Sequence, residues 1–420
     1  MSPNPMNGFS LACVECGARY AEAPTLTVCP ACALLQERGG VMRGVLRIEL
    51  DEPPHEWPSA PLNSPAALAE FLPVAGPGSF FSFPAGGTPL LSVPQLRSRL
   101  GMTHLWVKDD TRNPSGSTKD RASLLVVAKA IEYGFETVAC ASTGNAATAL
   151  AAAGAAAGIR TVVFVPAAAP PAKLVQMASY GARLVPVDAS YDEAFDLSVA
   201  ACERFGWYNR NTALNPYTIE GKKTAALEIA RDLAPEVADV VVVPTGDGVI
   251  ASGVAKGFAD LLRGGLIDRL PRIVVVQPEG SGAIARALRA GKGAIAPEAG
   301  AASVADSLVV GAPRNAIFCL AQVRESGGAG VLVSDDAILD AGALLARETG
   351  VFAEPAAAAA LAGLLVALEE GTVDHRDRVV LLVTGTGLKD IASARRRISI
   401  PAPVPPSIEA VEEFLGGSGL

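Results

Sequence analysis

Lys119 stands in the first turn of a predicted helix, which is an unusual position for a lysine. It stands in Asn113-Pro114-Ser115-Gly116-Ser117-Thr118-Lys119-Asp120-Arg121, a segment that follows an apolar run and opens a helical pattern. The positive end of a helix dipole disfavours an ammonium group in the first turn. That position favours the neutral amine, which is the form that condenses with an aldehyde. Taken alone, however, the segment fits an exposed lysine beside Asp120 better than a reactive one.

Two further segments are suited to binding anions. Both Ser142-Thr143-Gly144-Asn145 and Gly246-Asp247-Gly248-Val249-Ile250 lie between an apolar run and a helical pattern. Turns of this kind present backbone N–H groups at a helix N-terminus. The first segment suits a carboxylate, with simple helix capping as the alternative. The second suits a phosphate if the Asp247 side chain points away and braces the loop, and its glycine spacing matches neither a Walker nor a dinucleotide motif.

A fourth segment, Thr384-Gly385-Thr386-Gly387-Leu388-Lys389-Asp390, again follows an apolar run. The hydroxyl of Thr384 can hydrogen-bond a ring nitrogen, and a hydroxyl partner leaves such a nitrogen unprotonated. A plain glycine-rich turn at the end of a strand explains the segment equally well.

Four cysteines near the N-terminus have the spacing of a metal site. Cys13, Cys16, Cys29 and Cys32 form C-x2-C-x12-C-x2-C. Paired knuckles of this kind are typical of structural Zn²⁺, and a reducing compartment disfavours disulfides. The segment is too short to fold on its own core, so a metal would supply the missing stability. A knuckle that has lost its metal is the alternative, and the remaining cysteines, Cys140, Cys202 and Cys319, are expected in the core.

Alternating strands and helices are needed to position these segments. Short apolar runs predict strands at residues 105–107, 137–141, 160–165, 183–187, 240–243, 273–277, 330–333 and 379–384. Longer amphipathic or alanine-rich stretches predict helices at 119–133, 145–157, 191–205, 219–233, 250–263, 335–348 and 355–368. This alternation predicts an α/β fold of mostly parallel sheets flanked by helices, with ligands at the strand-to-helix turns.

The pattern divides the chain of 420 residues into four parts. Residues 1–45 are expected to form a zinc-ribbon-like head, and residues 46–83 a connector. Residues 84–400 are expected to form a body of two α/β subdomains, the smaller at roughly 110–215. The tail at 401–420 is rich in proline and glycine, so we expect it to be loosely ordered.

Composition excludes some functions. There are 43 acidic and 35 basic residues, which give a net charge of −8. Nucleic-acid binding requires a basic face, so this balance disfavours it. No run of about 20 apolar residues and no signal-peptide pattern is found. We therefore expect a cytoplasmic protein that does not bind membranes.

Together and in this order, the four segments resemble threonine synthase and its relatives, which have the tryptophan-synthase-β fold. The resemblance extends from about residue 72 to Asp390. The cysteine-bearing head is also similar to that of some threonine synthases. Further segments that carry the resemblance are Gly87-Thr88-Pro89-Leu90, Leu105-Trp106-Val107-Lys108-Asp109, Asn215-Pro216, Glu220-Gly221-Lys222-Lys223-Thr224 and Glu354-Pro355-Ala356.

The resemblance implies a cofactor, a reaction and a set of roles. Lys119 would carry pyridoxal 5′-phosphate (PLP) as a Schiff base and later remove the α-proton of the substrate. Asn145 would bind the ring oxygen, residues 246–250 the cofactor phosphate and Thr384 the ring nitrogen. The turn at residues 142–145 would bind the substrate carboxylate. The implied reaction converts O-phospho-L-homoserine and water to L-threonine and phosphate, in a homodimer.

The sequence departs from the family pattern where the substrate phosphate binds. The family has a hydroxyl, an asparagine and an arginine at positions that here hold Ala146, Thr212 and Thr218. Losing a bidentate cation removes bonds worth roughly 1.5–3 kcal/mol each. Two hypotheses follow. In the first, other cations bind the phosphate group of the substrate. In the second, the substrate carries no phosphate group, and the enzyme performs β-elimination or β-replacement on another amino acid. The candidate cations are Arg121, Arg210, Lys222 and Lys223, and for each the alternative is plain surface charge.

Overall fold

Valine-rich strands form a central six-stranded sheet in the computed structural model, which describes residues 8–37, 39–60, 62, 65–167, 171–189 and 191–417. The order of its strands is β12-β11-β10-β13-β5-β4. All neighbours are parallel except the edge pair β4 and β5. The strands are β4 (Leu90–Ser92), β5 (His104–Asp109), β10 (Val240–Pro244), β11 (Arg272–Pro278), β12 (Ala329–Val333) and β13 (Arg378–Val383).

Helices cover both faces of this sheet, as continuous apolar strands require. Alternate valines of β10 belong to two separate hydrophobic clusters. One cluster faces α13 (Pro355–Glu369) and α12 (Asp335–Thr349), and the other faces α8 (Thr224–Leu233) and α9 (Val249–Arg263). Smaller helices complete this part of the chain: α2 (Pro94–Arg99), α10 (Ala283–Arg289), α11 (Ala316–Glu325) and α14 (Ile391–Ala394).

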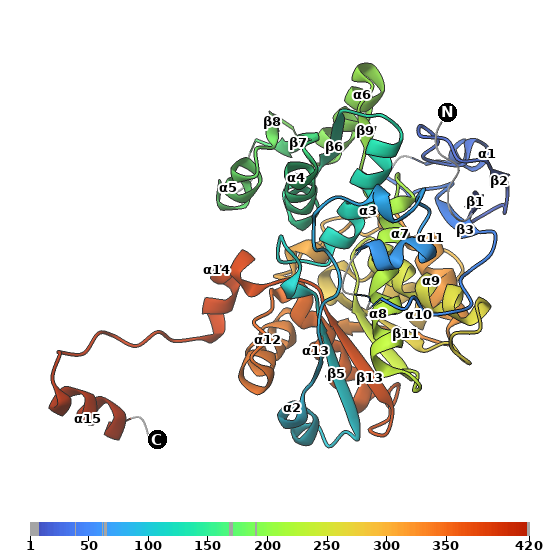
Figure 1. Cartoon of the computed structure of the whole chain (residues 1–420). Coiled ribbons are helices and arrows are strands. Elements are labelled where there is room, and N and C mark those ends of the chain that lie inside the picture. Colours follow the sequence, from blue (N-terminus) through green and yellow to red (C-terminus); the bar gives the residue numbers. More distant parts are fainter. Residues whose placement is uncertain are drawn as a thin grey trace.

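A second, four-stranded parallel sheet lies above the first in Figure 1. Its order is β8-β7-β6-β9, and its strands are β6 (Thr137–Ala141), β7 (Arg160–Pro166), β8 (Arg183–Val187) and β9 (Tyr208–Asn209). The chain enters this sheet through α3 (Lys119–Glu132) and leaves it through α7 (Tyr217–Lys222). Its own helices are α4 (Asn145–Ala157), α5 (Pro171–Ser179) and α6 (Tyr191–Phe205). The predicted α/β class with mostly parallel sheets is confirmed.

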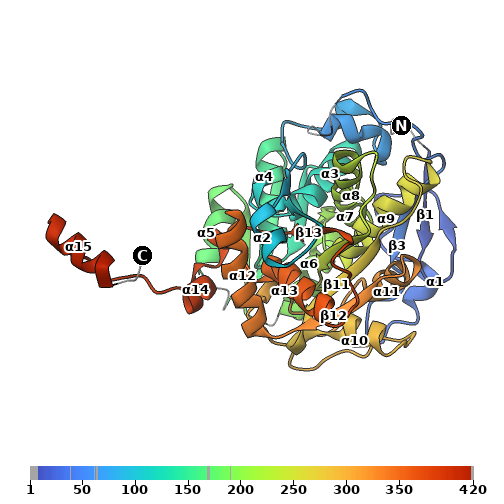
Figure 2. The same cartoon turned by 90° about the horizontal axis from the view of Figure 1, so that it is seen from below.

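The cysteine-bearing head forms a third sheet that packs on the body beside α7, α9 and α11 (Figures 1 and 2). Strand β1 (Phe9–Cys13) pairs with β2 (Arg19–Tyr20) and with β3 (Leu46–Leu50), and α1 (Pro30–Ala33) lies between them in the chain. The sheet of the head thus continues to Leu50, five residues beyond the expected boundary. Phe9 meets the Tyr217 ring edge-on at 6.4 Å, and Glu22 pairs with Lys129 at 2.7 Å.

The structure differs from the predicted elements in a few places. The helix predicted at 219–233 is two helices, α7 and α8, which are separated at Lys223. Helices α5, α10 and α11 and the short strand β9 were not expected from the apolar pattern of the sequence. The tail contains α15 (Ile408–Gly417), an exposed helix at the end of an arm that extends away from the body in Figure 1. The first seven residues of the expected head and the last three of the tail lie outside the described residues.

A buried ion-pair network joins α3, α8 and the end of β5. The guanidinium of Arg121 contacts Asp110 at 2.7 Å and Glu228 at 2.6 Å, and Lys108 reaches the same Glu228 at 2.9 Å. Burial alone would raise the pKa of both carboxyl groups, but Arg121 outweighs it and lowers them. Arg121 is therefore a structural cation and not the exposed charge that its position in the sequence allowed.

We expect Arg121→Met to lower the free energy of unfolding by about 3–5 kcal/mol, because it leaves two buried carboxylates without their main partner. Chemical denaturation of the wild-type and variant proteins measures the difference. Arg160→Met is the matched control: its ion pair with Glu136 is exposed, with side chains 71% and 82% accessible, so the loss should stay below about 1 kcal/mol. Equal losses in the two variants would contradict the prediction.

Candidate active site

Three of the four chemistry-bearing turns lie next to one another at one edge of the large sheet. They follow β5, β13 and β10, and β13 is hydrogen-bonded to both of the others. Because the three strands are parallel, their carboxyl ends meet at the same edge. The sheet topology therefore brings together Lys119, Thr384 and the loop at residues 246–250.

The turns after β5 and β13 are tied directly to each other. The backbone N–H of Thr118 donates to the Thr384 carbonyl at 2.8 Å, and the N–H of Thr386 donates to the Gly116 carbonyl at 3.0 Å. Ser117 and Gly385 form an isolated antiparallel bridge. Lys119, the first residue of α3, is thus held one residue from a strand-like junction with Thr384.

The turn of the small sheet reaches the same place through Asn145 and Glu354. The Asn145 amide donates to the Glu354 carboxyl at 2.8 Å, and the N–H of Glu354 donates to the Gly385 carbonyl at 3.0 Å. A side chain at Gly385 would meet Glu354 Oε1 at 2.5 Å and Asn145 Nδ2 at 3.4 Å. Only a glycine at position 385 lets Glu354 and Asn145 come this close to the turn that carries Thr384. The turn of the small sheet therefore joins the three turns of the large sheet. The contact of Glu354 with Asn145 and Gly385 was not predicted, although the sequence shows that Glu354 directly precedes an alanine-rich helix.

The glycine loop after β10 leaves donors free at the start of α9. Gly248 has φ +88°, and an added Cβ would lie 2.7 Å from Cys319 Cβ, so a side chain is excluded. The backbone N–H groups of Gly246, Asp247 and Gly248 donate to no group among the described residues. The Asp247 carboxyl accepts from the backbone N–H of Arg314 at 2.9 Å. It braces the loop, as expected, and the free N–H groups suit an anion.

The turn at residues 142–145 also keeps free donors. The N–H of Ser142 is bonded to Phe164, and that of Gly144 to the Ser142 hydroxyl, but the N–H of Thr143 has no partner in the described chain. A Cβ at Gly144 would meet nothing within 4 Å. The turn therefore faces open space at the N-terminus of α4, where a small anion fits.

Two ionisable groups at this convergence have pKa values near neutrality. Burial, and then the positive charge of Arg210, lower the pKa of the Lys119 amine to about 8. Burial raises the pKa of Glu354 to about 7, against the opposing effects of Lys389, Lys119 and Asn145. Perturbed groups of this kind concentrate at functional sites. The Lys119 amine therefore loses its proton just above neutral pH, and the Glu354 carboxyl group can hold a proton at neutral pH.

Comparisons with known proteins agree with this arrangement. A family model described as pyridoxal-phosphate dependent enzyme matches residues 81–385. Threonine synthase of Methanosarcina acetivorans is 35% identical over 415 residues, which cover 97% of this chain and 99% of that one. Threonine synthase of Methanocaldococcus jannaschii is 37% identical over 347 residues, covering 82% and 85%. The structure of threonine deaminase isoform 2 from Solanum lycopersicum shares the fold, with a TM-score of 0.62, 24% identity and coverage of 71% and 79%.

The fold and the four converging turns define a pyridoxal-phosphate dependent enzyme. Within that class the chain belongs to the threonine synthase family, as its similarity along nearly the full length of a relative shows.

The residues at the convergence fit the cofactor. The Lys119 amine makes no hydrogen bond or ion pair with any described residue, and neither does the hydroxyl of Thr384, which is 5% exposed. The glycine loop supplies unpaired N–H groups for a phosphate. An amine for the aldehyde, a hydroxyl and a phosphate cradle are the groups that PLP requires.

The four cysteines of the head form a second, separate site. Their sulfur atoms all lie within 4.8 Å of one another, and Cys13–Cys32 and Cys16–Cys29 are each separated by 3.7 Å. A tetrahedron with Zn–S bonds of about 2.3 Å has an edge of about 3.8 Å. Burial would raise the pKa of the Cys29 thiol, but hydrogen bonds, above all from Tyr20, lower it to about 6. The donor set therefore fits Zn²⁺.

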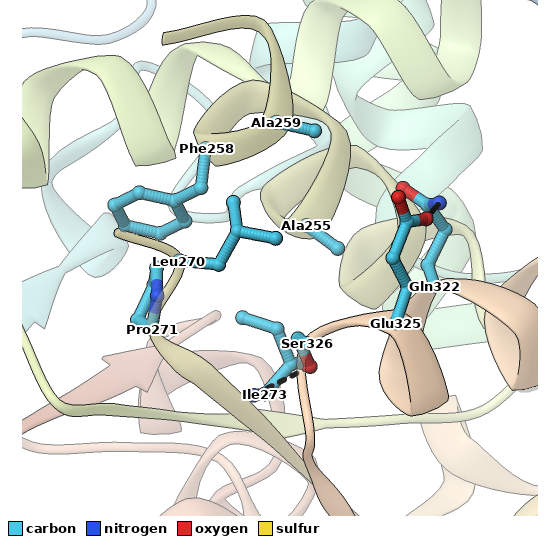
Figure 3. A pocket seen from close by; sticks show the side chains of 9 residues that line it. All are labelled: Ala255, Phe258, Ala259, Leu270, Pro271, Ile273, Gln322, Glu325 and Ser326. Carbon is cyan, nitrogen blue, oxygen red and sulfur yellow. Dashed lines mark hydrogen bonds between the residues drawn. The ribbon is translucent and has the colours of Figure 1, made fainter. Parts of the chain in front are cut away.

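The cavity drawn in Figure 3 is not part of the active site. It has a volume of about 10 Å³ and lies among Phe258, Leu270, Ile273 and Ser326. That volume holds about one water molecule. Ile273 belongs to the amino end of β11, whereas the three active-site turns of this sheet lie at its carboxyl edge. In the described part of the chain, no helix has the length and apolar character needed to cross a membrane.

We expect Lys119 to react as an amine with a pKa of about 8 in the PLP-free protein, well below the ordinary lysine value of 10.5. Below that pH the amine is protonated and unreactive, so its acetylation should rise with pH through a midpoint near 8. Competitive acetylation followed by peptide mass spectrometry measures this midpoint for each lysine. Exposed Lys292 in the same digest is the internal control for the labelling reaction. An acetylation of Lys119 that shows no midpoint near 8 would contradict the lowered pKa.

We expect the purified protein to contain about one zinc per chain, because the sulfur geometry matches a four-cysteine site. The double variant Cys13→Ser/Cys32→Ser should lose that zinc and unfold at a lower temperature, since metal binding contributes to folding. Atomic emission spectrometry measures the metal content. The variant Cys202→Ala, which removes a buried thiol from α6, should keep its zinc; a zinc-free wild-type protein that chelators do not destabilise would contradict the site.

Proposed function

We propose that the protein converts O-phospho-L-homoserine and water to L-threonine and phosphate. The observation that carries the proposal is the convergence of Lys119, Asn145, Thr384 and the glycine loop, in a chain whose relatives are named threonine synthase. We also propose that residues 84–400 act as the catalytic body, with the smaller unit at roughly 110–215.

The proposed cofactor roles follow the chemistry of each group. Lys119 would hold PLP covalently, residues 246–250 would bind its phosphate, Thr384 would face the ring nitrogen and Asn145 the ring oxygen. Bound PLP supplies a ring that stabilises negative charge at the α carbon of the substrate. The turn at residues 142–145 would orient the substrate through its carboxylate.

Proton movement is assigned to Lys119. A partly buried amine with a pKa of about 8 can both accept and return a proton near neutral pH. The three histidines of the chain do not serve here, because His55 bonds the Gly264 carbonyl, His375 bonds the Leu100 carbonyl, and His104 stands at the amino end of β5. The carboxyl group of Glu354 would keep the Asn145 amide in place.

We further propose a cytoplasmic homodimer. The arm after the body exposes large apolar side chains, including Ile398, Ile400, Ile408 and Val411. Exposed apolar groups in a row mark surfaces that bind another protein, and a second copy of the chain is the proposed partner.

The assay is inorganic phosphate release from O-phospho-L-homoserine by the PLP-loaded protein, with amino-acid analysis of the product. We expect phosphate and threonine in equal amounts, and no turnover by Lys119→Ala, which lacks the amine. Formation of an oxo acid from L-serine or L-threonine without phosphate release would instead favour the elimination reaction. The changes at Ala146, Thr212 and Thr218 are the observation that supports this alternative. An active Lys119→Ala variant would refute the mechanism.

A further inference from the structure

Two buried cations beside Lys119 have no anion. Arg210, directly after β9, is 1% exposed, and Lys222, the last residue of α7, is 2% exposed. Among the described residues no carboxylate lies within 4.0 Å of either side chain. Within the described part of the chain, the Arg210 side chain has a single hydrogen-bond contact, with Ser123 Oγ at 3.5 Å, and its Nε has no partner there. Burying an unpaired charge is costly, so these two positions need an explanation.

Every other buried cation in the described chain is paired. Lys223, the neighbour of Lys222, contacts Asp260 at 2.8 Å and also Glu220. Carboxylates likewise lie within 3 Å of the remaining four: Lys108, Arg121, Lys129 and Lys256. Buried cations in this fold are thus normally neutralised by a neighbouring carboxylate, and Arg210 and Lys222 are the exceptions among the described residues.

Both unpaired cations lie next to α3, the helix that begins at Lys119: Arg210 contacts Ser123 of α3, and α7, which ends at Lys222, packs on α3. Burial, and then the charges of Lys119 and Arg210, lower the pKa of Lys222 well below its ordinary value, and Asp247 is the acidic group that opposes them. Arg210 acts on the pKa of Lys119 in the same way. The three nitrogen-bearing side chains are thus near neighbours, and a bound anion would relieve their mutual repulsion.

Two considerations identify the anion. The cofactor phosphate has its own cradle of backbone N–H groups at the start of α9, so a second anion is required. Lys222 is four residues after Thr218, the position at which the family has its phosphate-binding arginine. Residues four apart lie on the same face of a helix, so Lys222 stands one turn beyond Thr218 on the same face of α7.

We propose that Arg210 and Lys222 bind the phosphate group of the amino-acid substrate, in place of the arginine that Thr218 lacks. The guanidinium provides the fork that matches a phosphate, and the ammonium adds a point charge. The identity of the substrate rests on the proposed function. The binding of a phosphate dianion rests on the two unpaired cations alone. A substrate without phosphate would leave both cations uncompensated, so the pair also acts in specificity.

The experiment measures binding of inorganic phosphate to the PLP-loaded protein, in which the cofactor site is already filled. Isothermal titration calorimetry should show one saturable site per chain in the wild type. Lys222→Gln and Arg210→Gln should each weaken it on the order of tenfold to a hundredfold, because each removes a charge-assisted bond. Arg376→Gln, which removes a cation 91% exposed at the amino edge of the sheet, should bind like the wild type.

Thermal unfolding gives a second, independent readout. Without phosphate, Lys222→Gln and Arg210→Gln should unfold at or above the wild-type temperature, because each removes an uncompensated buried charge. Added phosphate should raise the unfolding temperature of the wild type but not of these variants. Variants that unfold earlier than the wild type would show that the cations serve the fold, and would overturn the proposal.

The outcomes separate the two proposals. If the wild type makes threonine while both variants bind phosphate normally, the assignment of the cations is wrong and the proposed function stands. If the wild type makes no threonine but the variants lose phosphate binding, the anion site stands and the proposed function falls. If the variants lose affinity for PLP instead, the cations hold the cofactor phosphate and the proposal is wrong.

Discussion

The guanidinium of Arg121 is the interaction on which the arrangement of the active site depends. It lies two residues after Lys119 and is clamped between Asp110, directly after β5, and Glu228 of α8. The same carboxylates hold the preceding loop, since Glu228 accepts from the N–H of Gly87 and Asp110 from the Thr88 hydroxyl. A buried pair of this kind adds little net stability but fixes geometry. Lys119 is thereby held rigidly at a site where a loose amine would be less effective.

The distribution of charge separates structure from chemistry in this chain. Buried cations that organise the fold are saturated by carboxylates from several elements, as Lys223 is by α7 and α9. Among the described residues, the buried cations without a carboxylate partner are Arg210 and Lys222, and their charges interact with that of Lys119. An enzyme that binds a dianion needs such uncompensated positive charge, because an internal carboxylate would compete with the substrate.

The sequence predicted the strand-to-helix alternation, and the strands at 137–141 and 183–187 and the helix at 145–157 agree with the structure residue by residue. Apolar periodicity and glycine-rich turns are local signals that predict single strands, helices and turns. That the turns meet at one edge follows from the parallel arrangement of the strands. The sequence could not show that Arg121 and Lys223 are paired with carboxylates whereas Arg210 and Lys222 are not. Their partners come from distant parts of the chain, such as Glu228 for Arg121, and a sequence pattern does not reveal which side chains meet. The role of Glu354 was missed for the same reason.

The position of β13 has a consequence for how the protein is made. This strand is near the end of the chain, yet it lies between β10 and β5, so that His104 pairs with Arg378. Without it the large sheet falls into two separate pieces, β12-β11-β10 and β5-β4. During synthesis β5 therefore waits without its parallel neighbour until nearly the whole chain has left the ribosome. Such long-range pairing is slow and leaves strand edges open to aggregation. A chain that ends before Arg378 contains every strand of the small sheet but lacks β13 and the turn that carries Thr384, so its active site is incomplete.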